Sequence, residues 1–494
     1  MIGQIQDGSG DRMCPETPHV GLRLLPRHPL LALPILLCGA FLTPAQIGPA
    51  EQSALSQISA DSLRTNLAYI ASDGLQGRFT PSPGLTKAAS YIAGQFKQAG
   101  LAPAVNGSYF QIAPYAEFTP KLDDFHLTLK TGGTELTLAA ADVRVRSPKG
   151  LDLADTPVVI PPDGEVPAGK VIAAAGPKFT SDEAISEYQA SKPALILLVS
   201  RRPTGRRAPA SYIDDAAGTD APVIRISSPD LYAAIAEHKP LTLSIHLSAP
   251  ASKPAPVENV IGVLPGSDPK LRDEYVVVSA HYDHLGVRNG QIYNGANDNG
   301  SGTVSVIEIA KSLATLNPRP KRTIVFMTFF GEEEGLLGAY FYTHHPVFPL
   351  AKTVADINLE QMGRTDDRGA THYTSFSFTG PSYSDLPAAM TAAAKREHIG
   401  VYVKSDADDF FDRSDNYPFA EAGVVAHTAV VAYEYPDYHA PGDKPDKIDY
   451  KNMAAVDRGV AAGVLAIADR AEPPHWADEK KAAPYREAAT KAGQ

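Results

Sequence analysis

Cysteine is nearly absent from this chain of 494 residues, and its two cysteines, Cys14 and Cys38, both lie near the start. If that segment is removed as a leader, no thiol remains. Cysteine nucleophiles, thiolate-bound zinc and disulfide bonds are then excluded together. A metal in the remaining chain would need nitrogen and oxygen ligands.

Basic residues are in the minority. The chain has 45 lysines and arginines against 56 aspartates and glutamates, a formal net charge of −11. Binding to nucleic acid requires a surplus of basic side chains to neutralise phosphates, so we expect no nucleic-acid partner. A hydrophobic fraction of 44% and a charged fraction of 20% are typical of a soluble globular protein, and the length favours two domains with appendages.

Long hydrophobic runs are also scarce. The run at residues 30–42 follows Arg23 and Arg27, is interrupted by Pro34, and is followed by small residues. A charged start, a short apolar stretch and a small-residue exit are typical of an export signal, and the run is too short to span a membrane comfortably. We therefore predict a leader at residues 1–47 and an exported protein, periplasmic or secreted, with no stable membrane span once the leader is removed.

Cys38 suggests a lipid attachment site within this leader. However, Leu37 is larger than the residue that usually precedes such a cysteine. We therefore do not expect lipoprotein anchoring.

The rest of the chain shows two different sequence patterns. Short apolar runs between Pro- and Gly-rich turns predict a small β-rich domain, whereas later runs of strand type alternate with helical patterns, which predicts a mainly parallel sheet. We expect an α/β fold with a mainly parallel mixed sheet flanked by helices and an inserted β-rich domain. The predicted parts are the first peptidase-domain segment 48–122, the insert 123–252, the main segment 253–472 and a polar, frayed tail 473–494.

Within the main segment, four strands are predicted, each followed by a helix, with a hairpin-like segment at 371–378. The strands are 275–280, 323–330, 354–359 and 424–432, and the helices are 301–316, 336–344, 384–397 and 453–469.

Histidines and carboxylates follow these apolar strands. A lone histidine after a strand is usually structural, and an acidic triplet such as Glu332–Glu334 is usually the solvated start of a helix. Here four strand ends carry such residues, and ligands in open α/β sheets collect beyond the carboxyl ends of strands. The set suits catalytic zinc, with manganese or cobalt as substitutes, and two ions sharing a carboxylate would polarise a carbonyl and acidify a bridging water. The residues are His281, Asp283, Asp298, Glu332, Glu333, Glu334, Glu360 and His439.

Four segments together resemble peptidase family M28, the di-zinc aminopeptidase type. They are SAHYDHLG at 279–286, NGANDNGSG at 294–302, GEEEGLLG at 331–338, and His439 ahead of Pro441 and Asp443. Upstream, ASDGLQGR at 71–78 and AGLAP at 99–103 are similar to bacterial members. The β-rich insert resembles a protease-associated domain.

The resemblance implies a ligand set for two zinc ions. Asp298 would bridge the two ions, His281 and Glu360 would complete one site, and Glu333 and His439 would complete the other. The family often has aspartate at the position of Glu360, but the longer arm of glutamate can also reach a metal.

Two further roles follow from the resemblance. Asp283 would hydrogen-bond the ring of His281 and orient it. Glu332 would be the general base that takes a proton from the bridging water and passes it to the leaving amine. In a second register of the triplet, Glu334 would be the ligand in place of Glu333.

Several positions stay outside this assignment. Asn416 stands where the family usually has a histidine after Ser-Asp, and we expect it to line the substrate pocket. No metal role is assigned to His284, His344 or His345, for which structural or surface roles are expected.

The predicted function is that of an exported zinc aminopeptidase that removes N-terminal residues from peptides. The alternatives are a carboxypeptidase or glutaminyl cyclase on the same scaffold, or a non-catalytic receptor-like relative. A phosphatase would fit the ligand chemistry, but the sequence has no phosphate-cradling loop or arginine cluster near the site.

Overall fold

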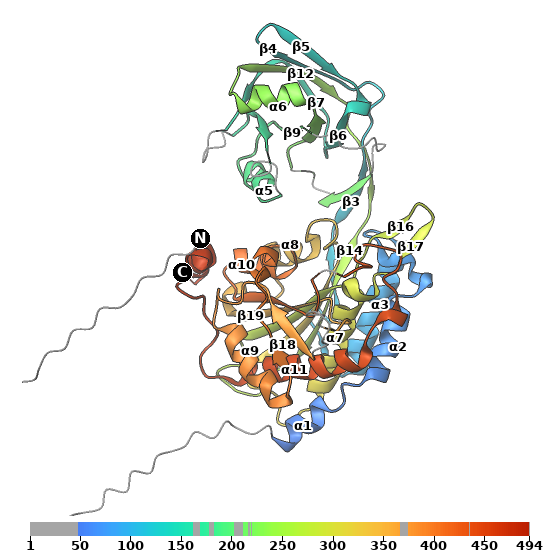
Figure 1. Ribbon diagram of the computed structural model, residues 1–494, viewed down its shortest axis with the longest axis vertical. Helices are drawn as coiled ribbons and strands as arrows, with labels where there is room; N and C mark the ends of the chain where they lie inside the picture. The colour runs from blue at the N-terminus through green and yellow to red at the C-terminus, as the bar shows by residue number, and fades with distance from the viewer. Residues whose placement is uncertain are drawn as a thin grey trace, which may run out of the picture. The chain divides into compact units, whose positions relative to one another are not determined.

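The computed structural model describes residues 48–161, 168–176, 182–201, 211–215, 218, 220–365, 374–433 and 435–493 (Figure 1). The predicted leader at 1–47 lies outside these residues.

The centre of the fold is a mixed sheet. Within the described ranges it has nine strands in the order β1-β14-β18-β15-β19-β22-β20-β21, with β2 also paired to β14. Its middle consists of four mutually parallel strands. These are β18 (Thr323–Phe329), β15 (Tyr275–His281), β19 (Thr353–Glu360) and β22 (Ala426–Val430).

These strands form where the sequence has continuous apolar runs, because both of their faces are covered. Every residue of β18 is buried, as is every residue of β15 after Tyr275. Such runs are typical of parallel strands between two layers of helices. The predicted α/β fold with a mainly parallel mixed sheet is confirmed.

Antiparallel strands complete both sides of the sheet. On one side, β14 (Val257–Leu264) pairs with β18, β1 (Ala102–Pro103) and β2 (Phe110–Ala113). On the other side, the hairpin-like segment expected at 371–378 lies partly outside the described residues. Ser375–Phe378 is a single strand, β20, which pairs with β22 and with the short strand β21 (Gly400–Val401).

Two groups of helices pack on this sheet. The first group includes α7, which contacts β15, β18 and β19, and α11, which contacts β15 and α9. The second group is α8, which contacts β14 and β18, and α10, which contacts β19 and β22. The helices are α1 (Pro49–Leu55), α2 (Ala60–Ile70), α3 (Pro83–Gln98), α7 (Gly302–Ala314), α8 (Leu337–His344), α9 (Leu386–Ala394), α10 (Asn416–Glu421) and α11 (Tyr450–Asp469).

The helix starts carry ordinary caps. The hydroxyl of Ser82 accepts from the Leu85 amide at the start of α3, and the carboxylate of Asp449 accepts from the Asn452 amide at the start of α11. Helix α7 begins at Gly302, where a Cβ would overlap the carbonyl oxygen of Leu359. Glycine therefore lets α7 start directly against the end of β19.

The residues after Glu472 are more ordered than expected. Trp476 is buried and donates its indole N–H to the carbonyl of Gly423, and helix α12 (Ala483–Ala492) follows. The ring of Trp476 packs against Tyr485, Phe411 and His427. The prediction of a frayed tail is wrong because these aromatic side chains anchor the segment.

A second sheet has its own hydrophobic core. Its strand order is β5-β4-β12-β7-β8-β9-β11-β6, and α5 (Asp182–Ala190) and α6 (Pro229–Ala236) lie between its strands in the sequence. The strands are β4 (His126–Thr131), β5 (Thr134–Leu138), β6 (Val143–Arg146), β7 (Leu151–Val159), β8 (Val171–Ala175), β9 (Leu195–Ser200), β11 (Val223–Ser227) and β12 (Leu241–Leu247).

The chain enters and leaves this second sheet through paired strands. Strand β3 (Tyr115–Thr119) lies between β13 (Ala251–Pro254) and β10 (Tyr212–Asp215), antiparallel to both. None of the helices within the described ranges is long and apolar enough to cross a bilayer.

Candidate metal centre

The predicted ligands meet at the carboxyl edge of the parallel strands. His281 is the last residue of β15, Glu360 is the last residue of β19, and Glu333 follows β18 within four residues. Asp298 lies in a short π-helical turn, η3 (Ala296–Ser301), just before α7. His439 comes from the loop between β22 and α11.

His281, Asp298 and Glu360 form the first cluster. The Nε2 atom of His281 lies 3.3 Å from Oε1 of Glu360 and 3.5 Å from Oδ1 of Asp298. All three residues are buried, and one donor atom of each lies within 4.8 Å of the others. Burial acts to lower the pKa of His281, but the Glu360 and Glu332 carboxylates outweigh it and raise that pKa well above its ordinary value.

Asp298, Glu333 and His439 form the second cluster. The Nε2 atom of His439 lies 3.1 Å from Oδ2 of Asp298 and 3.3 Å from Oε2 of Glu333. Burial acts to lower the pKa of His439, whereas its contacts with these two carboxylates raise it to about 10. Imidazoles that carboxylates hold in the cationic form mark a place where a metal cation is well accommodated.

Asp298 belongs to both clusters. Its Oδ1 faces His281 and its Oδ2 faces His439. Burial acts to raise the pKa of this carboxyl, but its contacts with His281 and His439 lower the pKa far below the ordinary value. This is the arrangement that a bridging carboxylate requires.

Backbone amides hold Asp298 in place. The Asp443 carboxylate, which is fully buried, accepts from the amides of Asn297 and Asp298 at 3.0 Å. The Tyr435 hydroxyl donates to the same carboxylate at 3.0 Å. Asp443 therefore fixes the peptide that carries Asp298.

Glu332 and Asp283 lie beside the first cluster. The Glu332 carboxylate is 3.8 Å from Nε2 of His281, and its side chain is 14% exposed. Burial raises the pKa of Glu332 well above its ordinary value. Asp283 Oδ1 lies 3.4 Å from Nδ1 of His281 and accepts from the backbone amide of Glu332 at 3.1 Å. Asp283 therefore connects the His281 ring to the segment that carries Glu332.

Glu360 is held by its second oxygen. Its Oε2 accepts from the Ser414 hydroxyl at 2.9 Å and from the Asn299 amide at 3.1 Å, which leaves Oε1 toward His281. These two bonds restrict the longer glutamate arm.

Asn416, in contrast, does not line a pocket. It is fully buried, donates to the Phe411 carbonyl and accepts from the Thr428 hydroxyl, so its expected place in a substrate pocket is wrong.

His284 was not assigned to the site but lies in it. It is fully buried, and its Nδ1 is 2.7 Å from Oε1 of Glu333, on the side of that carboxylate opposite to His439. Together with Asp298 and Glu333 it forms a second set of potential ligands. Gly295 makes room for the ring, because a Cβ there would overlap it. A histidine three positions after His281 was the available signal.

The other unassigned residues lie apart from these clusters. Within the described ranges, Glu334 pairs with none of the histidines, and burial raises its pKa to about 7. This geometry favours the register in which Glu333 faces His439. His344 and His345 lie at the end of α8 against the rings of Tyr340 and Phe341.

A further residue at the site is Tyr438. Its ring stacks on the His439 imidazole with 4.0 Å between centroids, and it is 41% exposed. Burial raises the pKa of its hydroxyl, and the Asp298 and Glu333 carboxylates raise it further. Tyr438 is therefore a partly exposed side chain against His439, and its hydroxyl stays protonated.

The residues fit divalent metal ions of the zinc type. Several buried nitrogen and oxygen atoms of the two clusters and of His284 lie close to one another but make no hydrogen bond within the described ranges. Nitrogen and oxygen ligands without thiolate are typical of catalytic zinc. These atoms are His281 Nδ1, His284 Nδ1 and Nε2, Asp298 Oδ2 and Glu333 Oε1.

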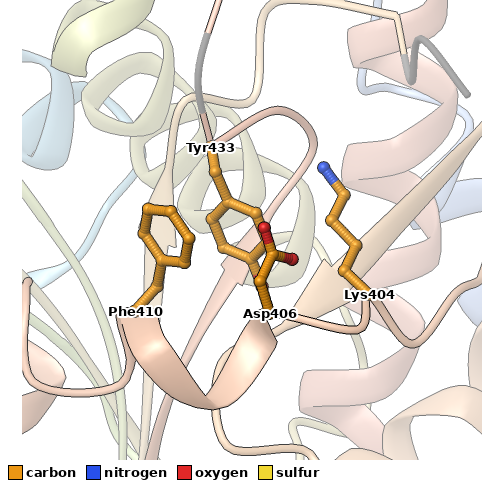
Figure 2. A pocket seen from close by; sticks show the side chains of 4 residues that line it. All are labelled: Lys404, Asp406, Phe410 and Tyr433. Atoms are coloured by element: carbon orange, nitrogen blue, oxygen red, sulfur yellow. The ribbon is translucent and has the colours of Figure 1, made fainter.

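A hollow of about 290 Å³ lies next to the end of β22, whose Val430 pairs with Glu360. Figure 2 shows the four side chains that line it, Lys404, Asp406, Phe410 and Tyr433. The Phe410 and Tyr433 rings stack at 4.3 Å, and the Lys404 Nζ lies 4.6 Å from the centroid of the Tyr433 ring. The hollow thus combines aromatic walls with one cation and one carboxylate.

Known proteins are similar to part of this chain. Aminopeptidase YwaD of Bacillus subtilis (strain 168) is 29% identical over 223 residues, which are 44% of this chain and 46% of that protein. A probable leucine aminopeptidase of Trichophyton verrucosum (strain HKI 0517) is 27% identical over 204 residues, 40% of this chain and 54% of that protein. The chain thus matches about half the length of these curated relatives.

Among solved structures, an aminopeptidase from Aneurinibacillus sp. strain AM-1 superposes with a TM-score of 0.52 at 18% identity, covering 87% of this chain and 98% of that chain. This likeness shows a common fold. Residues 259–464, which contain every predicted ligand, match the model of peptidase family M28. The region that holds the candidate metal centre is therefore the region similar to peptidase family M28.

Proposed function

We propose that this protein is a two-zinc aminopeptidase that hydrolyses the first peptide bond of peptide substrates. One observation carries the proposal. The two oxygens of Asp298 face two different histidine–carboxylate pairs, His281 with Glu360 and His439 with Glu333. The names of the curated relatives, aminopeptidase and probable leucine aminopeptidase, support the substrate class.

In this proposal, His281, Glu360 and Asp298 hold one ion, and Glu333, His439 and Asp298 hold the other. Bound ions of this kind supply Lewis acidity, which polarises a carbonyl and acidifies water. Manganese or cobalt would substitute for zinc in the same oxygen and nitrogen donor set.

Glu332 is the general base of the proposed reaction. Its carboxylate lies beside His281 and is not required as a ligand, so it is free to accept a proton and to return it to the leaving amine. Burial raises its pKa, which brings the carboxylate closer to the basicity that proton transfer near neutral pH requires. Asp283 orients His281 and, through the Glu332 amide, the base as well.

Substrate contacts are proposed for Tyr438 and for the hollow beside β22. Tyr438 is partly exposed and stacks on His439, and its protonated hydroxyl is proposed to donate to a carbonyl oxygen on which charge develops. The hollow with Phe410 and Tyr433 is proposed to accept the side chain of the first residue. Phe410→Ala is then expected to reduce kcat/KM roughly tenfold for a large apolar first residue, with little effect for alanine.

Export through the leader at 1–47 and a protease-associated role for residues 123–252 belong to the same proposal. The export part rests on the charged and apolar pattern of the first residues. The β-rich second sheet with its own core is consistent with an inserted domain.

Metal analysis and a substrate panel test the function. The purified protein is expected to contain two zinc ions per chain, to cleave amino-acid p-nitroanilides with a free amine, and to lose this activity after chelation. Matched N-acetylated substrates control for the free amine. Cleavage of N-acetylated but not free-amine substrates would contradict the aminopeptidase assignment, and release of C-terminal residues or cyclisation of N-terminal glutamine would assign the alternatives.

A further inference from the structure

Two arginines are fully buried in the described part of the chain, Arg78 and Arg322. Arg322 directly precedes β18, at the end of that strand opposite to Glu332 and Glu333, and pairs with the Glu274 carboxylate at 2.8 Å. Arg78 makes no such pair, since no described carboxylate lies within ion-pair distance of its guanidinium. Burying a guanidinium without a contacting counter-ion costs free energy. Its other contacts must therefore offset this cost.

The guanidinium of Arg78 donates only to backbone carbonyls. Its Nε donates to Tyr282 at 2.7 Å, Nη1 to Ile70 at 2.6 Å and to Asn294 at 2.8 Å, and Nη2 to Gly295 at 3.0 Å. Every nitrogen of the side chain is thus used.

Three of these four carbonyls belong to the segments that carry the candidate ligands. Tyr282 lies between His281 and Asp283, and Asn294 and Gly295 directly precede the turn that contains Asp298. Arg78 therefore bonds the strand end that carries one ligand to the loop that carries the shared ligand. It also ties both to the end of α2 through Ile70.

The charge of Arg78 is balanced at longer range. Burial lowers the pKa of its guanidinium to about 10, and the carboxylates of Asp283, Asp443, Asp298 and Glu333 act against that fall. Arg78 thus remains a cation at neutral pH beneath an acidic cluster.

We infer that Arg78 is a positioning residue, which fixes the segment of His281 relative to the segment of Asp298 before a metal binds. The inference deepens the proposed function and rests on it for the identity of the ligands.

Removing Arg78 has two opposite effects on the affinity for Zn²⁺. By Coulomb's law, loss of a nearby cation strengthens the binding of Zn²⁺. Loss of the four carbonyl bonds weakens it, because the ions must then order segments that were ordered in advance. The positioning role therefore predicts weaker zinc binding in Arg78→Met, whereas a charge effect alone predicts tighter binding.

The test is a Zn²⁺ titration of the chelator-treated full-length protein against a competing chelator. For Arg78→Met we expect affinity lower by roughly 10- to 100-fold, the usual effect of residues that orient ligands. Arg322→Met is the matched control, since it also removes a fully buried guanidinium bonded to carbonyls, those of Arg470 and Ile467. It should lower the Tm but leave the zinc affinity unchanged. Unchanged or tighter zinc binding by Arg78→Met overturns the inference.

Arg78→Lys separates charge from geometry. Lysine keeps the cation but cannot span four carbonyls, so its zinc affinity should lie between those of wild type and Arg78→Met. Equal affinity in wild type and Arg78→Lys would contradict the positioning role. If neither variant folds without metal, hydrogen exchange of the wild type decides. Amides in 281–298 that stay protected after zinc removal support the inference, and amides that lose protection overturn it.

This test is independent of peptidase activity. A wild type that binds zinc but cleaves no peptide contradicts the proposed function alone. An active wild type whose Arg78→Met variant binds zinc equally well contradicts the positioning role alone.

Discussion

At the scale of single residues, the carboxylates of the two clusters differ in the partners of their second oxygen atom. Glu360 gives its second oxygen to Ser414 and Asn299, and Glu333 turns one oxygen to His439 and the other to His284. Asp298 turns both oxygens toward imidazoles. The roles of these residues follow from such partners more than from residue type, since all are buried acids.

Glu332→Gln tests the base. The change removes a proton acceptor but no proposed ligand, so both zinc ions should remain and turnover should fall by roughly 10²- to 10⁴-fold. Metal analysis and kcat on a free-amine p-nitroanilide measure the two effects. If this variant loses a zinc ion, Glu332 is a ligand and the assigned register of the triplet is wrong.

His284→Asn tests the residue that the sequence did not assign. Loss of the imidazole frees Oε1 of Glu333, so zinc affinity at the His439 site should fall by roughly 10- to 100-fold. Competitive zinc titration reports the change. His344→Asn is the control, since His344 is exposed at the end of α8 and its replacement should have no effect.

At the scale of elements, prediction from the sequence succeeded where one physical cause dominates. Continuous apolar runs identified β15, β18, β19 and β22. The proposed ligands lie near the ends of these strands, but their individual roles were implied by the resemblance to a known family. The sequence did not predict the positions of His284 and Arg78, because their burial depends on packing between segments that are distant in sequence. The packing of Trp476 and Tyr485 was not predicted for the same reason. Isolated aromatic residues in a polar stretch show no periodicity.

The C-terminal segment covers a histidine whose titration should affect stability. His427 is fully buried, with ring nitrogens 2.8 Å from the Thr379 carbonyl and 2.6 Å from the Ser384 hydroxyl, and burial lowers its pKa to about 4. The unfolded chain, with the ordinary histidine pKa of 6.5, binds a proton first as pH falls. The neutral, buried imidazole of His427 therefore stabilises the folded state above pH 6.5. This stabilisation is lost as pH falls toward 4.

From pH 7.5 to pH 4.5 this group should reduce the free energy of unfolding by about 2 to 3 kcal/mol. Denaturant unfolding of the metal-free protein measures the loss, and His427→Gln should be less stable at pH 7.5 but lose correspondingly less on acidification. Equal pH slopes for both proteins would show that His427 does not contribute.

At the scale of the whole molecule, the second sheet is attached through strands that lie side by side. Ala251 of β13 pairs with Thr119 of β3, so the chain leaves for the second sheet and returns from it at neighbouring points. This explains how a predicted insert at 123–252 interrupts the peptidase segments without separating them. The sequence located the change of texture but not this pairing, because edge strands of four or five residues are too short to show a pattern.

Excision of the second sheet should leave the metal centre intact. Joining Thr119 to Ala251 through Asn-Gly, a turn suited to two antiparallel strands, should give a chain that unfolds cooperatively and binds zinc with the wild-type stoichiometry. Circular dichroism and metal analysis check both points. A chain that folds but binds no zinc would show that the metal centre depends on the excised residues.

The spread of the ligands along the chain sets an order of events in synthesis. The first ligand is residue 281 and the last is residue 439, which follows the final strand of the central sheet. A chain whose synthesis stops before residue 439 lacks His439, which is the partner of the Asp298 Oδ2 atom. Two-ion hydrolysis as proposed here therefore requires that synthesis has passed residue 439.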